Sequence, residues 1–320
     1  MLQESLDSSK QTADVCVDLL MGIVEKSPIH NGSSFCYRRS SKYLEVFLPT
    51  LRRDLPSSKR ALAPLLDRVL NEDVLNVLRR IPTGSIDCVY ADPDYNVGVK
   101  YNDVSYTKKF EDYISWCTSW SKESHRVLKD DGNFFIINYP RNNAYLRVGY
   151  LDNAFHDVNE YVWVYNTNIG HSKKKFTTAH RSILHCTKSK NNKFYKSNVA
   201  VPYENPGDKR IKKLIASGKS GRMPYSWLYF NMVKNVGFTK TFHSCQIPEG
   251  LSKTLIEAST KRGDTVLVLF GGSGSEIIEC KKLGRHFISA EIDKKYYSLI
   301  KERLRHGGAV PKKYRLLNRM

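Results

Sequence analysis

The stretch TVLVLFGGSGSE, residues 265–276, decides how this chain folds. Its opening residues, TVLVLF, are almost all apolar and predict a strand that is buried on both faces. The glycine-rich turn GGSGS follows directly, and we expect a helix to begin near Glu276. This order lets the backbone approach a nucleotide-like ligand at the start of the helix. A tight turn between a strand and a helix, with no ligand, is the alternative.

Strands and helices alternate on both sides of this stretch. Apolar spacing predicts two short helices, over residues 65–70 and 74–78. Alternation of this kind argues for an α/β fold in which a mostly parallel sheet carries helices on both faces. The buried strands are expected at residues 86–91, 133–138, 160–165 and 286–290, and the longer helices at residues 110–128, 249–260 and 294–305.

A carboxylate follows the strand after the glycine-rich turn. Glu291 lies twenty residues beyond Gly271, where its side chain can accept hydrogen bonds from both hydroxyls of a ribose. The chain has no GxxxxGK[ST] motif, which argues against a P-loop ATPase. Only thirty residues remain after Ala290, too few for the second half of a dinucleotide-binding fold.

The sequence ADPDYN, residues 91–96, stands at the end of another predicted strand. An Asp-Pro pair at the carboxyl end of a strand places a carboxylate and an exposed carbonyl in the ligand crevice, because proline cannot continue the hydrogen-bond ladder. Tyr95, two residues after the proline, can stack on a planar base. An ordinary Asp-Pro turn with a surface tyrosine is the alternative.

The chain is strongly basic. Its 320 residues include 51 Lys and Arg against 32 Asp and Glu, a formal net charge of +19, which points to nucleic acid or an anionic membrane surface as partner. The longest apolar stretch, residues 15–24, is short and interrupted by Asp18, so we expect no membrane partner. The opening residues MLQESLDSSK lack the pattern of a secretion signal, so we expect a cytoplasmic protein.

The cysteines and histidines show no metal-binding pattern. The seven cysteines are scattered without a CxxC pair, and the histidines show no HExxH or HxE…CxxC spacing. This argues against a disulfide framework and against a zinc site. We therefore expect reduced thiols and no metal.

Much of the positive charge gathers in one window. Residues 171–222 contain fourteen Lys and Arg, opposed only by Glu204 and Asp208, and leave a net +12. Aromatic residues are interleaved in or just beyond this window, which favours a nucleic-acid-binding region over a solubilising loop. The cations expected to contact phosphates are Lys173, Lys174, Lys175, Arg181, Lys209, Arg210, Lys212, Lys213 and Arg222.

Together these motifs resemble those of the amino-group DNA methyltransferases. Residues 92–98, DPDYNVG, resemble the DPPYNxG catalytic motif, and residues 270–274, FGGSG, resemble the FxGxG motif for S-adenosylmethionine. The catalytic motif comes first here, with the basic window between the two. This permuted order is similar to that of the β-class enzymes, which methylate adenine N6 or cytosine N4. The resemblance covers residues 70–304.

Three further segments extend the resemblance. Residues 71–75, NEDVL, stand where the family has an acidic residue near the cofactor adenine, and residues 242–248, FHSCQIP, resemble its HPxQxP segment. Residues 291–293, EID, with Tyr296 or Tyr297 resemble its acidic ribose site. The cofactor-binding set that the resemblance implies is Asp73, Asp92, His243, Gln246, Phe270, Gly271, Gly272, Ser273, Gly274 and Glu291.

The family's second proline is Asp94 here, which is the main departure from its pattern. In the family that proline stiffens the turn whose carbonyl accepts a hydrogen bond from the target amine. Asp94 loses the stiffness and adds a carboxylate, which either helps to hold an amine or weakens catalysis. Ser244, in place of the proline of the His-Pro pair, is a milder departure.

An exocyclic amine is a poor nucleophile, because its lone pair is delocalised into the ring. Acceptors at Asp92 and at the Pro93 carbonyl would favour a tetrahedral nitrogen and stabilise its developing positive charge. A base within a duplex must flip out to reach them, and Tyr95 is the candidate platform on which it stacks. The predicted catalytic residues are Asp92, Pro93, Asp94 and Tyr95.

The predicted function is therefore site-specific methylation of double-stranded DNA at adenine N6, in a restriction-modification or epigenetic setting. S-adenosylmethionine is the expected methyl donor and S-adenosylhomocysteine the product. Adenine is favoured because Asp92, at the first motif position, resembles the adenine enzymes more than the serine of the cytosine N4 group. The alternatives are an N4-cytosine enzyme, an RNA methyltransferase, and a catalytically silent nucleic-acid-binding protein. A homodimer and a companion restriction endonuclease are also expected from the resemblance.

The implied architecture is a Rossmann-like methyltransferase domain, with a mostly parallel seven-stranded sheet and an inserted basic target-recognition region. Residues 1–65 are expected to form an N-terminal arm or helical extension, and residues 306–320 a basic tail. The catalytic part would span residues 66–168, the insertion 169–238, and the cofactor part 239–305.

Overall fold

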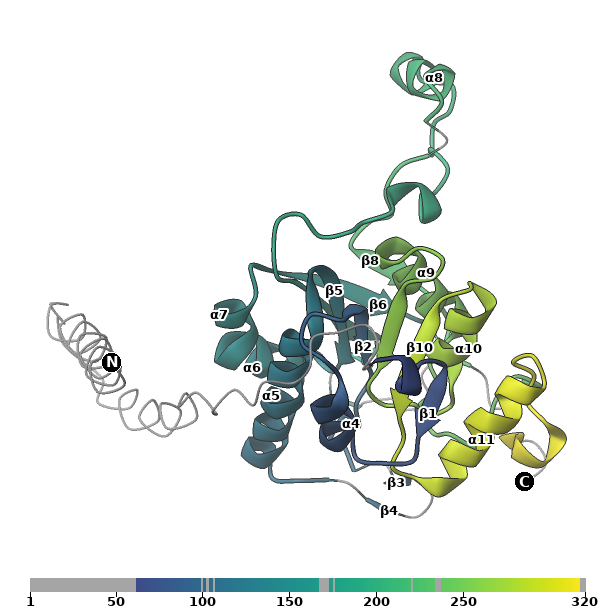
Figure 1. Ribbon diagram of the computed structural model, residues 1–320. Coiled ribbons are helices and arrows are strands. Elements are labelled where there is room, and N and C mark those ends of the chain that lie inside the picture. The colour runs from purple at the N-terminus through teal and green to yellow at the C-terminus, as the bar shows by residue number, and fades with distance from the viewer. Residues whose placement is uncertain are drawn as a thin grey trace, which may run out of the picture. The chain divides into compact units, whose positions relative to one another are not determined.

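The computed structural model describes residues 62–316, except residues 99, 102–103, 106, 167–172, 175, 220 and 234–236. The N-terminal arm expected over residues 1–65 thus lies outside the described residues as far as residue 61. The described part is built around one large sheet (Figure 1). Its strands, in spatial order, are β1 (Arg68–Leu70), β10 (His286–Ala290), β9 (Thr265–Val268), β2 (Ile86–Ala91), β5 (Leu128–Asn138), β7 (His180–Thr187), β6 (Asp157–Val164) and β8 (Trp227–Tyr229).

The sheet is mostly parallel, as expected. Every adjacent pair runs parallel except the two that involve β7, which is antiparallel to both β5 and β6. A short antiparallel ribbon of β3 (Lys100–Tyr101) and β4 (Val104–Ser105) stands apart from it. The described helices are α4 (Val74–Arg80), α5 (Phe110–Val127), α6 (Pro140–Leu146), α7 (Asp152–Ala154), α8 (Lys209–Ala216), α9 (Glu249–Ser259), α10 (Ser275–Lys282) and α11 (Lys294–Arg305).

Helices cover both faces of the sheet, because the central strands are apolar on both sides. Along β2, Val89 packs in one core with residues of α4 and α5. Its neighbour Tyr90 points to the other face and packs with residues of α9 and α10. Successive residues of a strand face opposite sides of the sheet, so a continuous apolar run builds two cores. The expected α/β fold with helices on both faces is confirmed.

The helix predicted for residues 65–70 is wrong. A single 3-10 turn ends at Leu65, Asp67 adopts a positive φ of 58°, and β1 follows. Strand β1 pairs in parallel with β10, Arg68 opposite Ile288. Four apolar residues within six positions are too few to distinguish a helix from a strand, and pairing with β10 decides the outcome.

Strand β7 was not predicted, because its sequence HRSILHCT lies in the basic window and looks half polar. Its Ser182 and His185 side chains are nevertheless buried and hydrogen-bonded, whereas His180 is exposed and Arg181 half-buried. The Ser182 hydroxyl donates to Glu160 Oε1 at 2.6 Å, and the His185 ring lies 2.9 Å from Asn133 Oδ1. Residues 169–238, expected as an insertion, therefore supply two strands of the sheet, and β8 makes the described sheet eight-stranded rather than seven-stranded.

The part of the basic window between Val201 and Arg222 forms a separate segment outside the sheet. A bridge between Val201 and Arg222 closes its base, and α8 lies between these two residues in the chain. Asp208 caps α8, and none of the helix's residues is buried. Among the described residues, no helix is both long and apolar enough to cross a membrane.

Candidate active site

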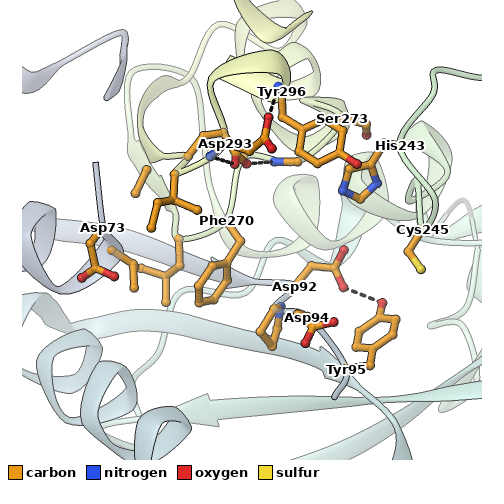
Figure 2. Close-up of a pocket in the computed structure, with 18 of the residues that line it drawn as sticks. Asp73, Asp92, Asp94, Tyr95, His243, Cys245, Phe270, Ser273, Asp293 and Tyr296 are labelled. Atoms are coloured by element: carbon orange, nitrogen blue, oxygen red, sulfur yellow. Dashed lines mark hydrogen bonds between the residues drawn. The ribbon is translucent and has the colours of Figure 1, made fainter. Parts of the chain in front are cut away.

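A cavity of about 250 Å³ lies at the carboxyl ends of β2, β9 and β10 (Figure 2). The chain leaves β2 toward β5 on one side and leaves β9 toward β10 on the other. A crevice between two strands whose connections diverge is the usual ligand site of an open α/β sheet. Of the predicted site residues, those that line the cavity are Asp73, Asp92, Pro93, Asp94, Tyr95, His243, Phe270, Gly271, Gly272, Ser273 and Glu291.

Asp92 follows β2 directly and enters the cavity with its carboxylate. The Tyr95 hydroxyl donates a hydrogen bond to Asp92 Oδ1 at 2.5 Å (Figure 2). Desolvation raises the pKa of Asp92 well above its ordinary value, and the nearby Glu276 carboxylate adds to the rise, whereas Arg181 opposes it. The catalytic motif thus holds an acceptor whose charge depends on its neighbours.

The turn around Asp94 is held by hydrogen bonds where the family has a proline. The Asp94 carboxylate accepts from the Asn96 N–H at 3.2 Å, and the Asp94 carbonyl accepts from the Tyr113 hydroxyl at 2.6 Å. Asn142 Nδ2 donates to the Tyr95 carbonyl at 2.8 Å. The expected loss of stiffness is therefore offset, because side chains brace the turn.

The glycine-rich turn forms the opposite wall of the cavity. The Gly272 N–H donates to Glu291 Oε2 at 2.7 Å, and the Asp293 N–H donates to Glu291 Oε1 at 2.8 Å. A Cβ on Gly271 would lie 2.7 Å from Ile300 Cδ1, so the close approach of the backbone requires glycine here. Burial raises the pKa of Glu291 to about 7, despite these two hydrogen bonds.

The two ends of the cavity carry polar groups from other elements. Asp73 caps α4 by accepting from the Leu75 N–H at 2.9 Å. The His243 ring meets Tyr296 edge-on, with 4.6 Å between ring centroids. Burial, and then the nearby Lys240 cation, lower the pKa of His243 to about 3, so the ring is neutral at physiological pH.

Two members of the predicted cofactor set do not line the cavity. The Gln246 side chain accepts from the Thr241 N–H at 2.9 Å and donates to the Thr239 carbonyl at 3.0 Å. It therefore orders the segment that carries His243. Gly274 is the N-cap of α10, with a φ of 80°.

Sequence reasoning missed Glu276 and Trp116, which also line the cavity. Glu276 lies in the first turn of α10, is 4% exposed, and accepts from the Ser252 hydroxyl at 3.4 Å. Burial raises its pKa to about 7. Its place directly after the glycine-rich turn was the available signal. Trp116, on α5, packs against Phe270 with 5.4 Å between ring centroids, and no local motif marks it.

The predicted phosphate-binding cations fall into separate groups. Those on α8 are exposed, as are Lys173 and Lys174, while Lys175 lies outside the described residues. Arg222 pairs with Glu204 and lies over the Tyr225 ring, 4.1 Å from its centroid. Arg181 departs from the prediction, because β7 places it beside Tyr95 at the catalytic motif.

The cavity lining suits a nucleoside that carries a cationic amino-acid chain. Apolar surface from Phe270 and Trp116 lines the cavity together with four carboxyl groups, those of Asp73, Asp92, Glu276 and Glu291. Ribose hydroxyls donate to carboxylates, and buried carboxylates are stabilised by a cation. These residues therefore fit S-adenosylmethionine.

Comparison with known proteins agrees with this geometry. A family model described as DNA methylase matches residues 86–302. The chain belongs to this family. M.BglII of Bacillus subtilis, a type II methyltransferase, is 31% identical to this DNA methylase over 250 residues, which are 73% of this chain and 68% of the relative. YhdJ of Escherichia coli K12, a DNA adenine methyltransferase, is 29% identical over 244 residues, 74% of this chain and 82% of the relative.

Solved structures show the same fold. The cytosine-N4-specific PvuII DNA methyltransferase superposes with a TM-score of 0.57 at 19% identity, over 73% of this chain and 85% of its own. The M1.HpyAVI–SAM complex superposes with a TM-score of 0.53 at 20% identity, over 74% of this chain and 98% of its own. The methyltransferase fold of this DNA methylase is confirmed, and S-adenosylmethionine is the methyl donor of the family.

Proposed function

We propose that this DNA methylase transfers the methyl group of S-adenosylmethionine to the N6 amine of a flipped-out adenine in double-stranded DNA. The observation that carries the proposal is the joint placement of Asp92 and Tyr95 in one cavity with the glycine-rich turn. The proposed cofactor residues are Asp73, Asp92, His243, Phe270, Gly271, Gly272, Ser273, Glu276 and Glu291.

The chain's own residues would hold the amine and its developing charge. The Asp92 carboxylate and the Pro93 carbonyl would accept the two N–H bonds of the target amine, which favours a tetrahedral nitrogen. The bound cofactor supplies an electrophilic methyl group on a sulfonium. Tyr95 would stack on the flipped base and keep water from its face. An ionised Asp92 is the stronger acceptor and stabilises the developing positive charge, so the charges around it bear directly on the rate.

The proposed DNA interface lies on α8 and on the edge strand β8. Helix α8 presents Lys209, Arg210, Lys212 and Lys213 to solvent. Tyr225, Trp227 and Tyr229 are each about half exposed, and the first two rings stack with 6.0 Å between centroids. Cations neutralise phosphates and aromatic faces stack on bases, so both belong in a nucleic-acid interface.

Adenine is favoured over cytosine as the target. YhdJ is an adenine enzyme, and Asp92 stands where adenine enzymes carry aspartate, while the structural likeness to the cytosine-N4-specific PvuII enzyme keeps the N4 alternative open. The same carboxylate would accept a hydrogen bond from adenine N6 or from cytosine N4, because the chemistry at the nitrogen is the same. The identity of the methylated base is therefore what the decisive experiment must read.

The test is nucleoside mass spectrometry of mixed-sequence duplex DNA incubated with the protein and isotopically labelled S-adenosylmethionine, beside an Asp92→Ala control. Labelled N6-methyladenine that is absent with the control supports the proposal. Labelled N4-methylcytosine would replace adenine by cytosine as the target. No labelled base in DNA would overturn the proposal. The same assay on RNA then distinguishes an RNA methyltransferase from a silent binder, for which Asp94→Pro is the rescue variant.

A restriction-modification setting is part of the proposal, supported by the type II relative M.BglII. The proposal also includes a cytoplasmic location, a companion endonuclease and a homodimeric state. Methylation at one short DNA sequence that blocks cleavage by an endonuclease encoded nearby would support this setting. A single mass from light scattering, twice that of the chain, would support the dimer.

A further inference from the structure

Arg181 lies among three tyrosine rings at the catalytic motif. Its guanidinium carbon is 3.9 Å from the centroid of Tyr139, and 5.4 Å from those of Tyr95 and Tyr165. Arg181 Nη1 also donates to the Tyr165 hydroxyl and to the His180 carbonyl. Strand β7 brings the residue there, because its antiparallel register sets Arg181 opposite Trp163 on β6. The side chain is half-buried, unlike the exposed cations of α8.

The rings connect this cation to the catalytic carboxylate. Tyr95 and Tyr139 pack edge to face, with 5.4 Å between centroids and an interplanar angle of 89°. The Tyr95 ring is 3% exposed, and its hydroxyl donates to Asp92. A guanidinium against ring faces adds attraction that increases as water is excluded. Arg181 therefore limits where Tyr95, and through it Asp92, can lie.

The titratable groups around Asp92 are carboxyls and neutral tyrosine hydroxyls, with the Arg181 cation among them. Asp94 and Tyr95 come from the motif itself, Tyr90 from β2, and Glu276 from α10. Arg181 is the cation that favours the ionised form of Asp92 against burial and against Glu276. Such a cation has a large effect where the surroundings are desolvated.

We propose that Arg181 is a positioning residue for methyl transfer: its guanidinium lies among the Tyr95, Tyr139 and Tyr165 rings, holds Tyr95 in place, and through the Tyr95 hydroxyl orients the Asp92 carboxylate toward the target amine. This proposal rests on the proposed role of Asp92 as acceptor of that amine. It replaces the prediction that Arg181 contacts a DNA phosphate. The guanidinium lies over rings and uses Nη1 to donate to Tyr165 and to the His180 carbonyl, which favours the positioning role over a phosphate contact.

The proposal makes a statement about pH. The ionised Asp92 carboxylate is the stronger acceptor, and loss of the nearby cation raises the pKa of Asp92, so activity at low pH should suffer most. The test measures kcat/KM for duplex DNA at saturating S-adenosylmethionine from pH 5.5 to 9.5, for the wild type, Arg181→Met and Arg181→Lys. We expect the acidic limb of Arg181→Met to move up by about one pH unit or more, about a tenfold loss below the limb. Arg181→Lys should restore the limb, because it keeps the charge.

A second variant tests the proposed role of Arg181 in case Arg181→Met does not fold. Tyr165→Phe removes the hydroxyl that accepts from Arg181 and leaves the ring in place. We expect it to shift the limb in the same direction by a smaller amount, with an unchanged thermal midpoint. An unshifted limb in both Arg181→Met and Tyr165→Phe would overturn the proposal.

Arg222→Met is the matched control, since Arg222 also lies over a tyrosine ring, 4.1 Å from the Tyr225 centroid. It should lower the salt dependence of DNA binding and leave the pH limb in place. If instead Arg181→Met lowers the salt dependence and leaves the limb unmoved, Arg181 is a phosphate contact and the proposal fails. If Asp92→Asn is as active as the wild type, the proposed role of Asp92 fails, and this outcome is distinguishable from failure at Arg181.

Discussion

The cavity at β2 and β9 and the helix α8 use charge in opposite ways. The cavity buries carboxylates whose pKa values are raised by desolvation, as at Glu276 and Glu291. Helix α8 presents a run of exposed cations and buries none of its residues. Buried charges are few and sensitive to each neighbour, whereas exposed charges act together and are screened by salt. Under the proposed function, this difference would separate methyl transfer in the cavity from DNA attraction at α8.

Arg181 and Arg222 show the same contrast within the basic window. Each lies over a tyrosine ring, at the Tyr139 and Tyr225 centroid distances of 3.9 and 4.1 Å. Arg181 is carried by an inner strand beside Tyr95, and Arg222 by the bridge that closes the segment carrying α8. Residue type and ring contact are therefore shared, and only the tertiary position leads us to propose different tasks for the two arginines.

The largest effect is expected at Asp92. Asp92→Asn should lower kcat roughly a thousandfold. The amide oxygen can accept a hydrogen bond from the target amine, but it lacks the negative charge that stabilises the positive charge developing on the nitrogen. DNA affinity should stay within about threefold, since the α8 cations are untouched. Methyl transfer from labelled cofactor and fluorescence anisotropy of DNA measure the two quantities.

Asp94→Asn is the control for that variant. An asparagine oxygen at residue 94 can still accept from the Asn96 N–H, so the turn should persist and most activity should remain. Equal losses in Asp92→Asn and Asp94→Asn would mean that the motif needs negative charge in general, and the special role of Asp92 would be lost.

The next effect concerns α8. Replacing Lys209, Lys212 and Lys213 by Gln should reduce the slope of log affinity against log salt by about 2–3, since each phosphate contact contributes roughly 0.9. Affinity for DNA should fall accordingly, while turnover at saturating DNA changes far less. Binding titrations at about 50–300 mM salt give this slope.

A triple change with the same loss of charge serves as control. Lys261, Lys281 and Lys301 are exposed and lie outside the proposed interface. Changing all three to Gln should leave the slope nearly unaltered. A similar drop for both triples would show that net charge, rather than the position of α8, governs DNA binding.

A smaller effect is expected at the glycine-rich turn. In Gly272→Ala the new Cβ would lie 3.1 Å from His243 Nε2, on a residue whose φ is 50°. Overpacking of this kind costs about 1–3 kcal/mol, so S-adenosylmethionine should bind about tenfold more weakly. Gly263→Ala has similar backbone strain, with a φ of 83° and nothing within 4 Å of its Cβ. It should lower the thermal midpoint and leave the calorimetric cofactor affinity unchanged, and an equal loss of affinity would contradict the cavity assignment.

The smallest effect is a dependence of cofactor binding on pH. Glu276 and Glu291 have pKa values of about 7 in the folded protein, above the ordinary value of 4.5. Their protonated forms are thus favoured by folding, so the stability of the free protein should fall as pH rises from about 4.5 through 7. A cationic ligand favours the ionised forms, so its affinity should rise several-fold between pH 6 and 8.

Calorimetry in two buffers of different ionisation enthalpy reads the protons released on binding. Glu276→Gln should release fewer protons at pH 6.5 than the wild type. An affinity that does not change with pH would show that these carboxylates do not face the ligand's charge.

Much of the site was readable from local sequence. The motifs at residues 92–95 and 270–274 each follow a strongly apolar strand, and the parallel sheet brings their ends to one edge. Gln246 was assigned to the cofactor because its segment resembles a family motif, yet its side chain is used within the turn. Glu276 was missed although it directly follows the glycine-rich turn, and Trp116 was missed because no local motif marks it.

The sequence by itself determined the alternation of strands and helices, the order of the two motifs and the concentration of positive charge, since these are properties of neighbouring residues. Only the tertiary structure decided that residues 180–187 form an inner strand, that residues 68–70 pair with β10, and that Arg181 lies beside Tyr95. Pairing between distant segments determines these features, and their free energy depends on burial and partners that no local pattern encodes.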